Sequence, residues 1–189
     1  MLLKILTAGS GGQGVLTLGN ILGNAAMMAD LHVTYLPSYG AAMRGGTANC
    51  TVCISDEEVA SPVSSTPDIL VAMNQPSLIA FITRLEPGGQ LIYNADLVDQ
   101  VPERGDVEMI AAPVNRIARR LGNERTANMV MLGALVKLMK ILDIETIIKS
   151  IDVMMGSKKK IAETSAAALR IGYEEFPFDQ DTLSARKMP

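Results

Sequence analysis

A glycine-rich hexapeptide near the start of the chain stands between an apolar run and a stretch with helical periodicity. Gly9-Ser10-Gly11-Gly12-Gln13-Gly14 fits the pattern G-x-G-x-x-G, with Gly9, Gly11 and Gly14 at the marked positions. Residues 2–8 form a short apolar run that is typical of a buried parallel strand. Residues 13–29 repeat apolar side chains at helical spacing. The sequence therefore predicts a strand, a tight turn and a helix in direct succession.

Such a turn is suited to binding phosphate. The first glycine permits the tight turn, the second lets a pyrophosphate approach the backbone, and the third lets the helix pack on the strand. The helix N-terminus adds free N–H groups and a partial positive charge. We therefore expect a phosphate-bearing ligand or a partner group to contact Gly9, Gly11, Gly12, Gln13 and Gly14. The alternative is that the glycines serve only a close turn between strand and helix.

Two well-known nucleotide sites fit this loop poorly. A classical NAD site needs an Asp or Glu at the end of the second strand, where it binds the ribose. No acidic residue lies between Leu31 and Ser55, and Asp30 stands at the wrong end of that strand. A Walker P-loop is also excluded, because the Gly-Lys-Ser/Thr ending is missing.

The rest of the chain alternates strands with helical segments and becomes helical after residue 112. Further strands are expected at 32–37, 47–55, 69–73, 90–93 and 107–112, and further helices at 76–85, 114–121, 125–142, 144–150 and 158–171. This alternation implies a parallel sheet with right-handed crossovers. We predict an α/β, Rossmann-like doubly wound fold with a mainly parallel sheet and C-terminal helices. One domain should cover residues 1–172, followed by an irregular tail over 173–189.

A second glycine-rich segment, Ser38–Gly46, follows the second strand and should lie at the same edge of the sheet as the first loop. Arg44 stands among small residues there, and its guanidinium suits a phosphate or carboxylate. The alternative is a surface arginine that pairs with Glu57 or Glu58. The candidate ligand-binding residues of this segment are Ser38, Tyr39, Arg44, Gly45 and Gly46.

The sequence offers no catalytic group of its own. His32, the only histidine, starts a strand and reads as structural. Cys50 and Cys53 are spaced C-x-x-C but lie in a strand, where residues three apart point to opposite faces, so both are expected to be buried thiols. One His and two Cys provide no iron–sulfur cluster or structural zinc. The chemistry is therefore expected to come from a partner.

Charge and hydropathy narrow the class of protein further. The net charge is −3, and the one run of three basic residues, Lys158–Lys160, is typical of a solvated helix face, so no nucleic-acid partner is expected. No window approaches 18 apolar residues, so no membrane span is predicted. Met1–Leu6 is too short and too interrupted for a signal peptide, and a cytoplasmic location is expected.

Taken together, the segments resemble the gamma subunit of 2-oxoacid:ferredoxin oxidoreductases. The resemblance begins at Gly11-Gly12-Gln13-Gly14 and extends to about Ile171. It further includes Ser38-Tyr39-Gly40, Arg44-Gly45-Gly46, Ile54-Ser55, Ser61-Pro62, Pro67-Asp68-Ile69-Leu70-Val71-Ala72-Met73-Asn74, Pro87-Gly88-Gly89 and Asn128. Residues 43–50 are most similar to 2-oxoglutarate-type enzymes, with pyruvate, ketoisovalerate and indolepyruvate types as alternatives. Ala41-Ala42 stand where members of the family commonly carry Pro-Glu.

The resemblance implies one subunit of an enzyme that oxidatively decarboxylates a 2-oxoacid, forms an acyl-coenzyme A and passes electrons to ferredoxin. It implies alpha, beta and ferredoxin-like delta partners, which hold or share thiamine diphosphate and the iron–sulfur clusters, and an isolated chain that is inactive. The phosphates of coenzyme A would suit the glycine loop and Arg44. Two alternatives stay open, a stand-alone NAD(P)-binding reductase and a purely structural scaffold subunit. A homodimer of the isolated chain is plausible.

Overall fold

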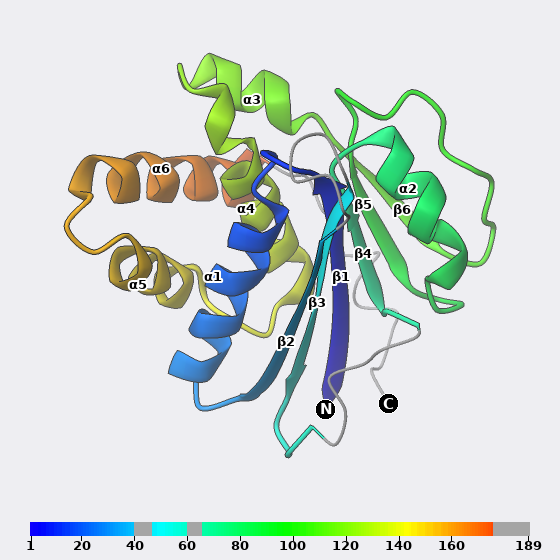
Figure 1. Ribbon diagram of the computed structural model, residues 1–189, viewed down its shortest axis with the longest axis horizontal. Coiled ribbons are helices and arrows are strands. Elements are labelled where there is room, and N and C mark those ends of the chain that lie inside the picture. Colours follow the sequence, from blue (N-terminus) through cyan, green and yellow to red (C-terminus); the bar gives the residue numbers. More distant parts are fainter. Residues whose placement is uncertain (40–46, 60–65, 176–189) are drawn as a thin grey trace.

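The computed structural model describes residues 1–39, 47–59 and 66–175 of the chain (Figure 1). The strands in these ranges are β1 (Leu2–Ser10), β2 (His32–Tyr39), β3 (Thr47–Ser55), β4 (Ile69–Ala72), β5 (Gln90–Asn94) and β6 (Glu108–Ala112). The helices are α1 (Val15–Met28), α2 (Gln75–Phe81), α3 (Val114–Arg120), α4 (Ala127–Met139), α5 (Ile144–Met155) and α6 (Lys159–Glu175), with short 3-10 turns η1 (Ile82–Arg84) and η2 (Glu124–Thr126). Each strand and helix predicted from the sequence is present.

The strands form one mixed sheet with the order β2-β3-β1-β4-β5-β6. β1, β4, β5 and β6 pair in parallel, which confirms the predicted α/β fold with a mainly parallel sheet. β3 departs from the expected parallel alternation, because it runs antiparallel to both β1 and β2. Only residues 40–46 join β2 to β3, whereas a parallel pair needs a crossover of about a dozen residues or more.

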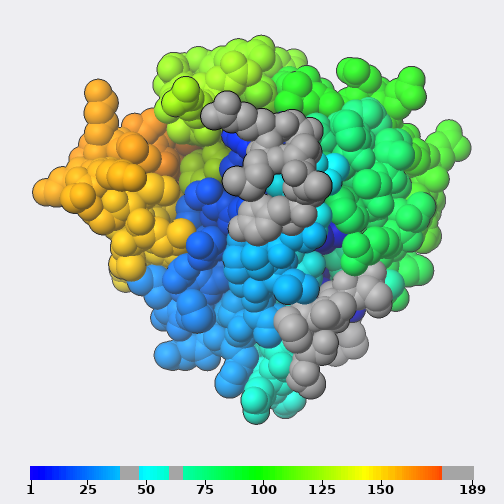
Figure 2. Space-filling model, in the orientation of Figure 1, coloured from blue at the N-terminus to red at the C-terminus, as the bar shows by residue number. Residues whose placement is uncertain are grey.

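Alternate residues of the central strands belong to two separate hydrophobic cores, one on each face of the sheet. Ile5, Val71 and Ile92 point to the face covered by α1 and the C-terminal helices, where they join the larger buried cluster. Leu6 and Leu91 point to the opposite face and pack in a smaller cluster with residues of α2 and η1. In Figures 1 and 2, α5 and α6 lie beside α1, on the other side of the molecule from α2. The period of two along each strand thus produces the layers of an α/β fold.

The C-terminal helices pack closely on one another and on α1. A side chain at Gly133 of α4 would overlap the carbonyl of Leu169, and one at Gly172 of α6 would overlap the carbonyl of Val130, so these helices cross backbone to backbone. α6 continues to Glu175, four residues beyond the expected end at Ile171, and the rest of the predicted tail lies outside the described residues. Among the described residues, none of the helices has the length and hydrophobicity that a transmembrane span requires.

Candidate functional site

The glycine loop joins β1 directly to α1, as the sequence predicts, and its glycines have two different roles. Gly9 is buried, and a Cβ there would lie 2.8 Å from Val15 Cγ1 and 3.0 Å from Met73 Cβ. Gly14 is the N-cap of α1 with φ 72°, and a Cβ there would overlap the side-chain amide of Asn128. Both glycines therefore serve packing. Gly12, with φ 96°, faces open space and leaves the backbone accessible.

Gln13 is a predicted ligand-binding residue whose side chain holds the loop in place. Its Oε1 accepts hydrogen bonds from the backbone N–H of Ser10 at 2.7 Å and from Asn74 Nδ2 at 2.8 Å. Its Nε2 donates to the carbonyl of Met73 at 3.1 Å. These bonds tie the loop to the carboxyl end of β4. The side-chain amide of Gln13 is therefore occupied within the chain, and the accessible groups at this turn belong to the backbone around Gly11 and Gly12.

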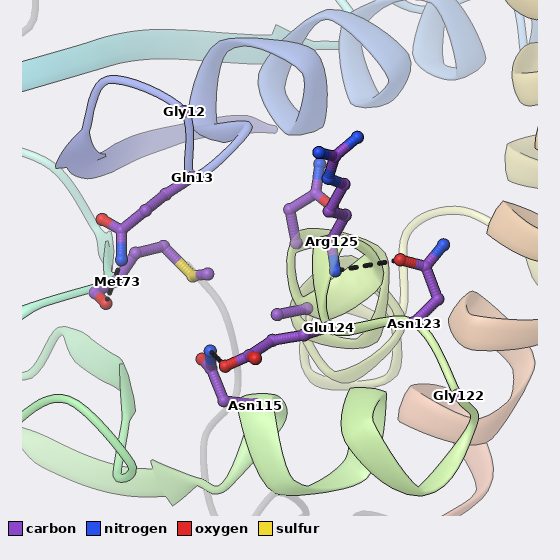
Figure 3. A pocket seen from close by; sticks show the side chains of 10 residues that line it. Gly12, Gln13, Met73, Asn115, Gly122, Asn123, Glu124 and Arg125 are labelled. Atoms are coloured by element: carbon purple, nitrogen blue, oxygen red, sulfur yellow. Dashed lines mark hydrogen bonds between the residues drawn. The ribbon is translucent and has the colours of Figure 1, made fainter. Parts of the chain in front are cut away.

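A pocket of about 510 Å³ opens between this loop and the connection from α3 to α4 (Figure 3). In the figure, Gly12, Gln13 and Met73 lie on one side, and Asn115, Glu124 and Arg125 on the other. The described residues that line the pocket are Gly12, Gln13, Met73, Asn115, Gly122, Asn123, Glu124, Arg125, Ala127 and Asn128. The pocket lies at the carboxyl ends of β1 and β4, the edge where open α/β sheets bind ligands.

A network of hydrogen bonds connects the two walls of this pocket. Asn94 Nδ2 donates to the carbonyl of Met73 at 3.3 Å and to Asn115 Oδ1 at 2.7 Å. Asn115 Nδ2 in turn donates to Glu124 Oε1 at 2.9 Å. The carbonyl of Met73 therefore accepts from both Gln13 and Asn94. This network connects the glycine loop to the α3–α4 connection, two segments that are far apart in sequence.

The pocket contains two charged side chains, Glu124 and Arg125, and only Glu124 forms an ion pair within the described residues. Arg119 Nη2 lies 2.7 Å from Glu124 Oε1, and the hydrogen bonds from Arg119 and then Asn115 hold the pKa of Glu124 below its ordinary value. Glu124 is therefore a paired carboxylate at neutral pH. Arg125 is exposed, and no carboxylate of the described residues pairs with it. A guanidinium of this kind beside an accessible glycine turn is suited to binding an anion such as a phosphate.

Of the second glycine-rich segment, Ser38–Gly46, the structure describes Ser38 and Tyr39, which lie at the same edge of the sheet as the glycine loop. Tyr39 pairs with Ala48, and Ala48 with Gly9, so the ends of β2 and β1 are level across the sheet. Ser38 is exposed there. Arg44, Gly45 and Gly46 lie outside the described residues, and their predicted ligand role stays a prediction.

The order of the strands explains why the acidic residue of a classical NAD site is missing from this chain. In a dinucleotide site the strand beside β1 ends at the ribose and carries the acidic residue. Here β3 occupies that position and runs the other way, so its first residues, Thr47 and Ala48, lie beside the loop. No acidic residue occurs in β2 or β3 of the described chain.

The remaining sequence candidates carry no reactive site. Cys50 and Cys53 are buried in β3, as predicted, and burial raises the pKa of the Cys50 thiol despite hydrogen bonds from its neighbours. Cys50 Sγ lies 3.0 Å from Thr7 Oγ1. His32 is exposed at the start of β2. Among the described residues, no three or more His, Cys, Asp or Glu side chains are grouped so that they could hold a metal ion.

The wall formed by Asn115, Asn123, Glu124 and Arg125 did not emerge from the sequence as a site. The one available signal is Gly122-Asn123, a turn between two predicted helices, where Gly122 has φ 80° and Asn123 Oδ1 accepts from the backbone N–H of Arg125 at 3.2 Å. A turn of this kind indicates only a helix boundary. Its position opposite the glycine loop depends on how α4 packs.

The chain is similar in sequence to subunits of oxidoreductases. Residues 4–175 match the family described as pyruvate ferredoxin/flavodoxin oxidoreductase. Ketoisovalerate oxidoreductase subunit VorA of Methanothermobacter thermautotrophicus is 40% identical over 172 residues, which are 90% of this chain and 36% of VorA. The 2-oxoglutarate synthase subunit KorC of Methanocaldococcus jannaschii is 37% identical over 175 residues, 90% of this chain and 92% of KorC. The chain thus spans about a third of the length of VorA and most of that KorC.

Solved structures show the same fold. The gamma subunit of a keto/oxoacid ferredoxin oxidoreductase from Geobacter sulfurreducens superposes with a TM-score of 0.77 at 30% identity, over 91% of this chain and 96% of that chain. A 2-oxoglutarate:ferredoxin oxidoreductase from Magnetococcus marinus, with 2-oxoglutarate, coenzyme A and succinyl-CoA bound, gives a TM-score of 0.83 at 24% identity. That match covers 100% of this chain and 32% of that chain, and its low identity shows the fold alone.

Proposed function

The chain belongs to the pyruvate ferredoxin/flavodoxin oxidoreductase family, and from that premise we propose that it is the gamma subunit of a multi-subunit 2-oxoacid:ferredoxin oxidoreductase of the 2-oxoglutarate type. The observation that carries the proposal is the match to KorC of Methanocaldococcus jannaschii over 92% of that subunit's length. A second KorC, from Methanothermobacter marburgensis, is 43% identical over 140 residues, which are 75% of that subunit. The longer VorA supports the family and leaves ketoisovalerate as the competing substrate.

Within the complex, we assign to this chain the binding of coenzyme A phosphates rather than a chemical step. The backbone around Gly12 is accessible, and Arg125 lies on the same pocket with no carboxylate partner in the described residues. Backbone N–H groups at the start of α1 and a guanidinium are the donors that suit a phosphate. Glu124 lines the same pocket, but its ion pair with Arg119 reduces its electrostatic repulsion of a phosphate.

Thiamine diphosphate and iron–sulfur clusters belong to the partner subunits in this proposal. Thiamine diphosphate supplies carbanion chemistry, and the clusters carry electrons to ferredoxin. The residues of this chain bind and orient coenzyme A, and Gln13 and Asn94 hold the two walls of its pocket together. The alpha, beta and delta partners and a cytoplasmic location stay part of the proposal, as does a homodimer of the isolated chain.

Purification of the tagged chain from its source organism, with its bound partners, tests the proposal. The complex is assayed with coenzyme A, a viologen dye and, in turn, 2-oxoglutarate, ketoisovalerate, pyruvate and indolepyruvate. We expect turnover by the complex, fastest with 2-oxoglutarate, and none by the chain alone. Turnover by the isolated chain contradicts a supporting subunit. Fastest turnover with ketoisovalerate keeps the family and changes the substrate.

A fluorescence titration with NADH addresses the stand-alone reductase. Binding of NADH by the isolated chain at micromolar concentration, together with dye reduction, supports that alternative. The absence of binding at millimolar NADH removes it.

A further inference from the structure

The outer side of helix α2 and of the 3-10 turn η1 that follows it carries no charge. Residues 75–83 contain no Asp, Glu, Lys or Arg. The exposed side chains of this segment are Pro76, Ile79, Ala80 and Thr83, at the spacing i, i+3, i+4 and i+7 that places residues along one side of a helix. Ile79 is 54% exposed. In Figures 1 and 2, α2 lies at the surface of the molecule, on the other side from α5 and α6.

The inner side of the same segment is apolar as well. Leu78 and Ile82 are buried in the smaller hydrophobic core, which also contains residues of the sheet. A helix that is hydrophobic on all sides is normally buried on all sides. By contrast, α5 exposes Glu145, Lys149 and Asp152. The outer side of α2 is therefore better suited to contact with another protein than with water, because the core of a protein interface is depleted of charged residues.

A second exposed apolar side chain lies in the segment that is bonded to the beginning of α2. Leu97 is 40% exposed, and its carbonyl accepts a hydrogen bond from the backbone N–H of Gln75 at 3.2 Å. Gln75 Oε1 also accepts from the backbone N–H groups of Asp99 and Gln100, each at 2.9 Å. Because Gln75 and Ile79 are four residues apart, they lie on the same side of the helix. The segment with Leu97 therefore extends the uncharged surface at the first turn of α2.

This surface, the α2 face, consists of Pro76, Ile79, Ala80, Thr83 and Leu97. Exposed apolar side chains that are scattered singly are ordinary, whereas a contiguous group of them marks an interaction site.

The α2 face is held in a fixed position relative to the glycine loop by Asn74, the N-cap of α2. Asn74 Oδ1 accepts from the backbone N–H of Ser77 at 2.9 Å. Its Nδ2 donates to Ser10 Oγ at 2.6 Å and to Gln13 Oε1 at 2.8 Å. A protein bound to the α2 face therefore lies beside the edge of the sheet at which the glycine loop stands.

We propose that the α2 face is the docking surface for the partner subunit that carries thiamine diphosphate, and that this partner covers it with an uncharged, apolar surface of its own. The inference rests on the proposed function, in which coenzyme A is bound at the glycine loop and the chemistry comes from a partner. That partner has to reach the loop, and the α2 face adjoins it. In VorA the matching region is 36% of the chain, so the domain there is joined to further polypeptide.

Purification of the tagged chain from its source organism tests the docking surface, with the thiamine diphosphate recovered per tagged chain as the readout. We expect the wild type to retain thiamine diphosphate through a wash with about 1 M NaCl, because salt screens charge pairs and leaves an apolar interface intact. Ile79→Glu should lower the recovered amount about tenfold or more, because the new carboxylate would be buried without a partner. Ile79→Leu should retain it.

Val153→Glu is the matched control, since Val153 is 67% exposed on α5, away from the α2 face. Circular dichroism of each purified variant checks that the exposed substitutions leave the fold intact. The docking surface is overturned if Ile79→Glu retains as much thiamine diphosphate as the wild type, or if Val153→Glu loses as much as Ile79→Glu. It is also overturned if the isolated wild-type chain is a dimer in gel filtration that Ile79→Glu dissociates, because the occupant is then a second copy.

The same experiment separates this inference from the proposed function. A wild-type chain that brings down no thiamine diphosphate refutes the proposed function and the docking surface with it. Equal recovery by the wild type and Ile79→Glu keeps the proposed function and refutes the docking surface alone.

Discussion

The Nε2 of Gln13 donates to the main-chain carbonyl of Met73 at 3.1 Å, and this bond joins the glycine loop to the end of β4. The same carbonyl accepts from Asn94, which continues the network to the far wall of the pocket. The loop is therefore held by side chains from neighbouring strand ends as well as by its own glycines. Its geometry is set before any ligand arrives, and a preorganised site loses less entropy on binding.

Replacement of Gln13 by Ala should destabilise the chain by about 2 kcal/mol, because Asn74, Ser10 and the carbonyl of Met73 all lose a hydrogen-bond partner. Urea denaturation followed by circular dichroism measures the change. Gln100→Ala is the control, since Gln100 is exposed and its hydrogen bonds with the side chain of Gln75 use only its backbone N–H and carbonyl. Equal stability of the two variants would show that the bonds of Gln13 do not hold the loop.

Gly14→Ala and Gly12→Ala should differ in their effect on stability, although both glycines have positive φ. At Gly12 the new methyl group meets open space, so only backbone strain of about 1 kcal/mol is expected. At Gly14 the methyl group also overlaps the amide of Asn128, and the total should reach about 3 kcal/mol or more. Urea midpoints of the two variants give the comparison.

Gly14→Ala combined with Asn128→Ala tests the cause of that difference. Asn128 donates to the carbonyl of Gly14 at 3.3 Å, so its removal alone costs a hydrogen bond. In the double variant the overlap with the amide group is gone and only the 3.3 Å contact with the Cβ of residue 128 remains, so the loss of stability should be smaller than the sum of the two single losses. Strict additivity would mean that Gly14 and Asn128 do not interact.

The thiol of Cys50 should make stability depend on alkaline pH. Burial holds its pKa above the ordinary value of 9.0, so the folded chain binds the thiol proton more tightly than the unfolded chain. This contribution is complete below the unfolded pKa and is lost as pH rises through the folded one. Between about pH 7 and about pH 10, the wild type should therefore lose more stability than Cys50→Ala, as measured by urea denaturation. Parallel losses in the two proteins would contradict the assignment.

The sequence predicted those parts of the fold that local patterns determine. The alternation of apolar residues in β3 and the glycines between β1 and α1 are local signals, and both elements formed as expected. The antiparallel direction of β3 was not predicted, although the short link of residues 40–46 already pointed to it. Of the two walls of the candidate pocket, the sequence indicated the glycine loop but not the wall that contains Arg125. That wall depends on the packing of α4 against α1 and α6, which no local pattern encodes.

Whether this chain binds the phosphates of coenzyme A is tested by the KM for coenzyme A of the assembled complex that carries Gly12→Asp or Arg125→Gln. A negative charge at the accessible turn should raise this KM about tenfold, and so should the loss of the Arg125 guanidinium, which has no carboxylate partner among the residues that the structure describes. The KM for the 2-oxoacid and the size of the complex in gel filtration should stay at their wild-type values. An unchanged KM for coenzyme A in both intact variant complexes would contradict the account and favour a purely structural subunit.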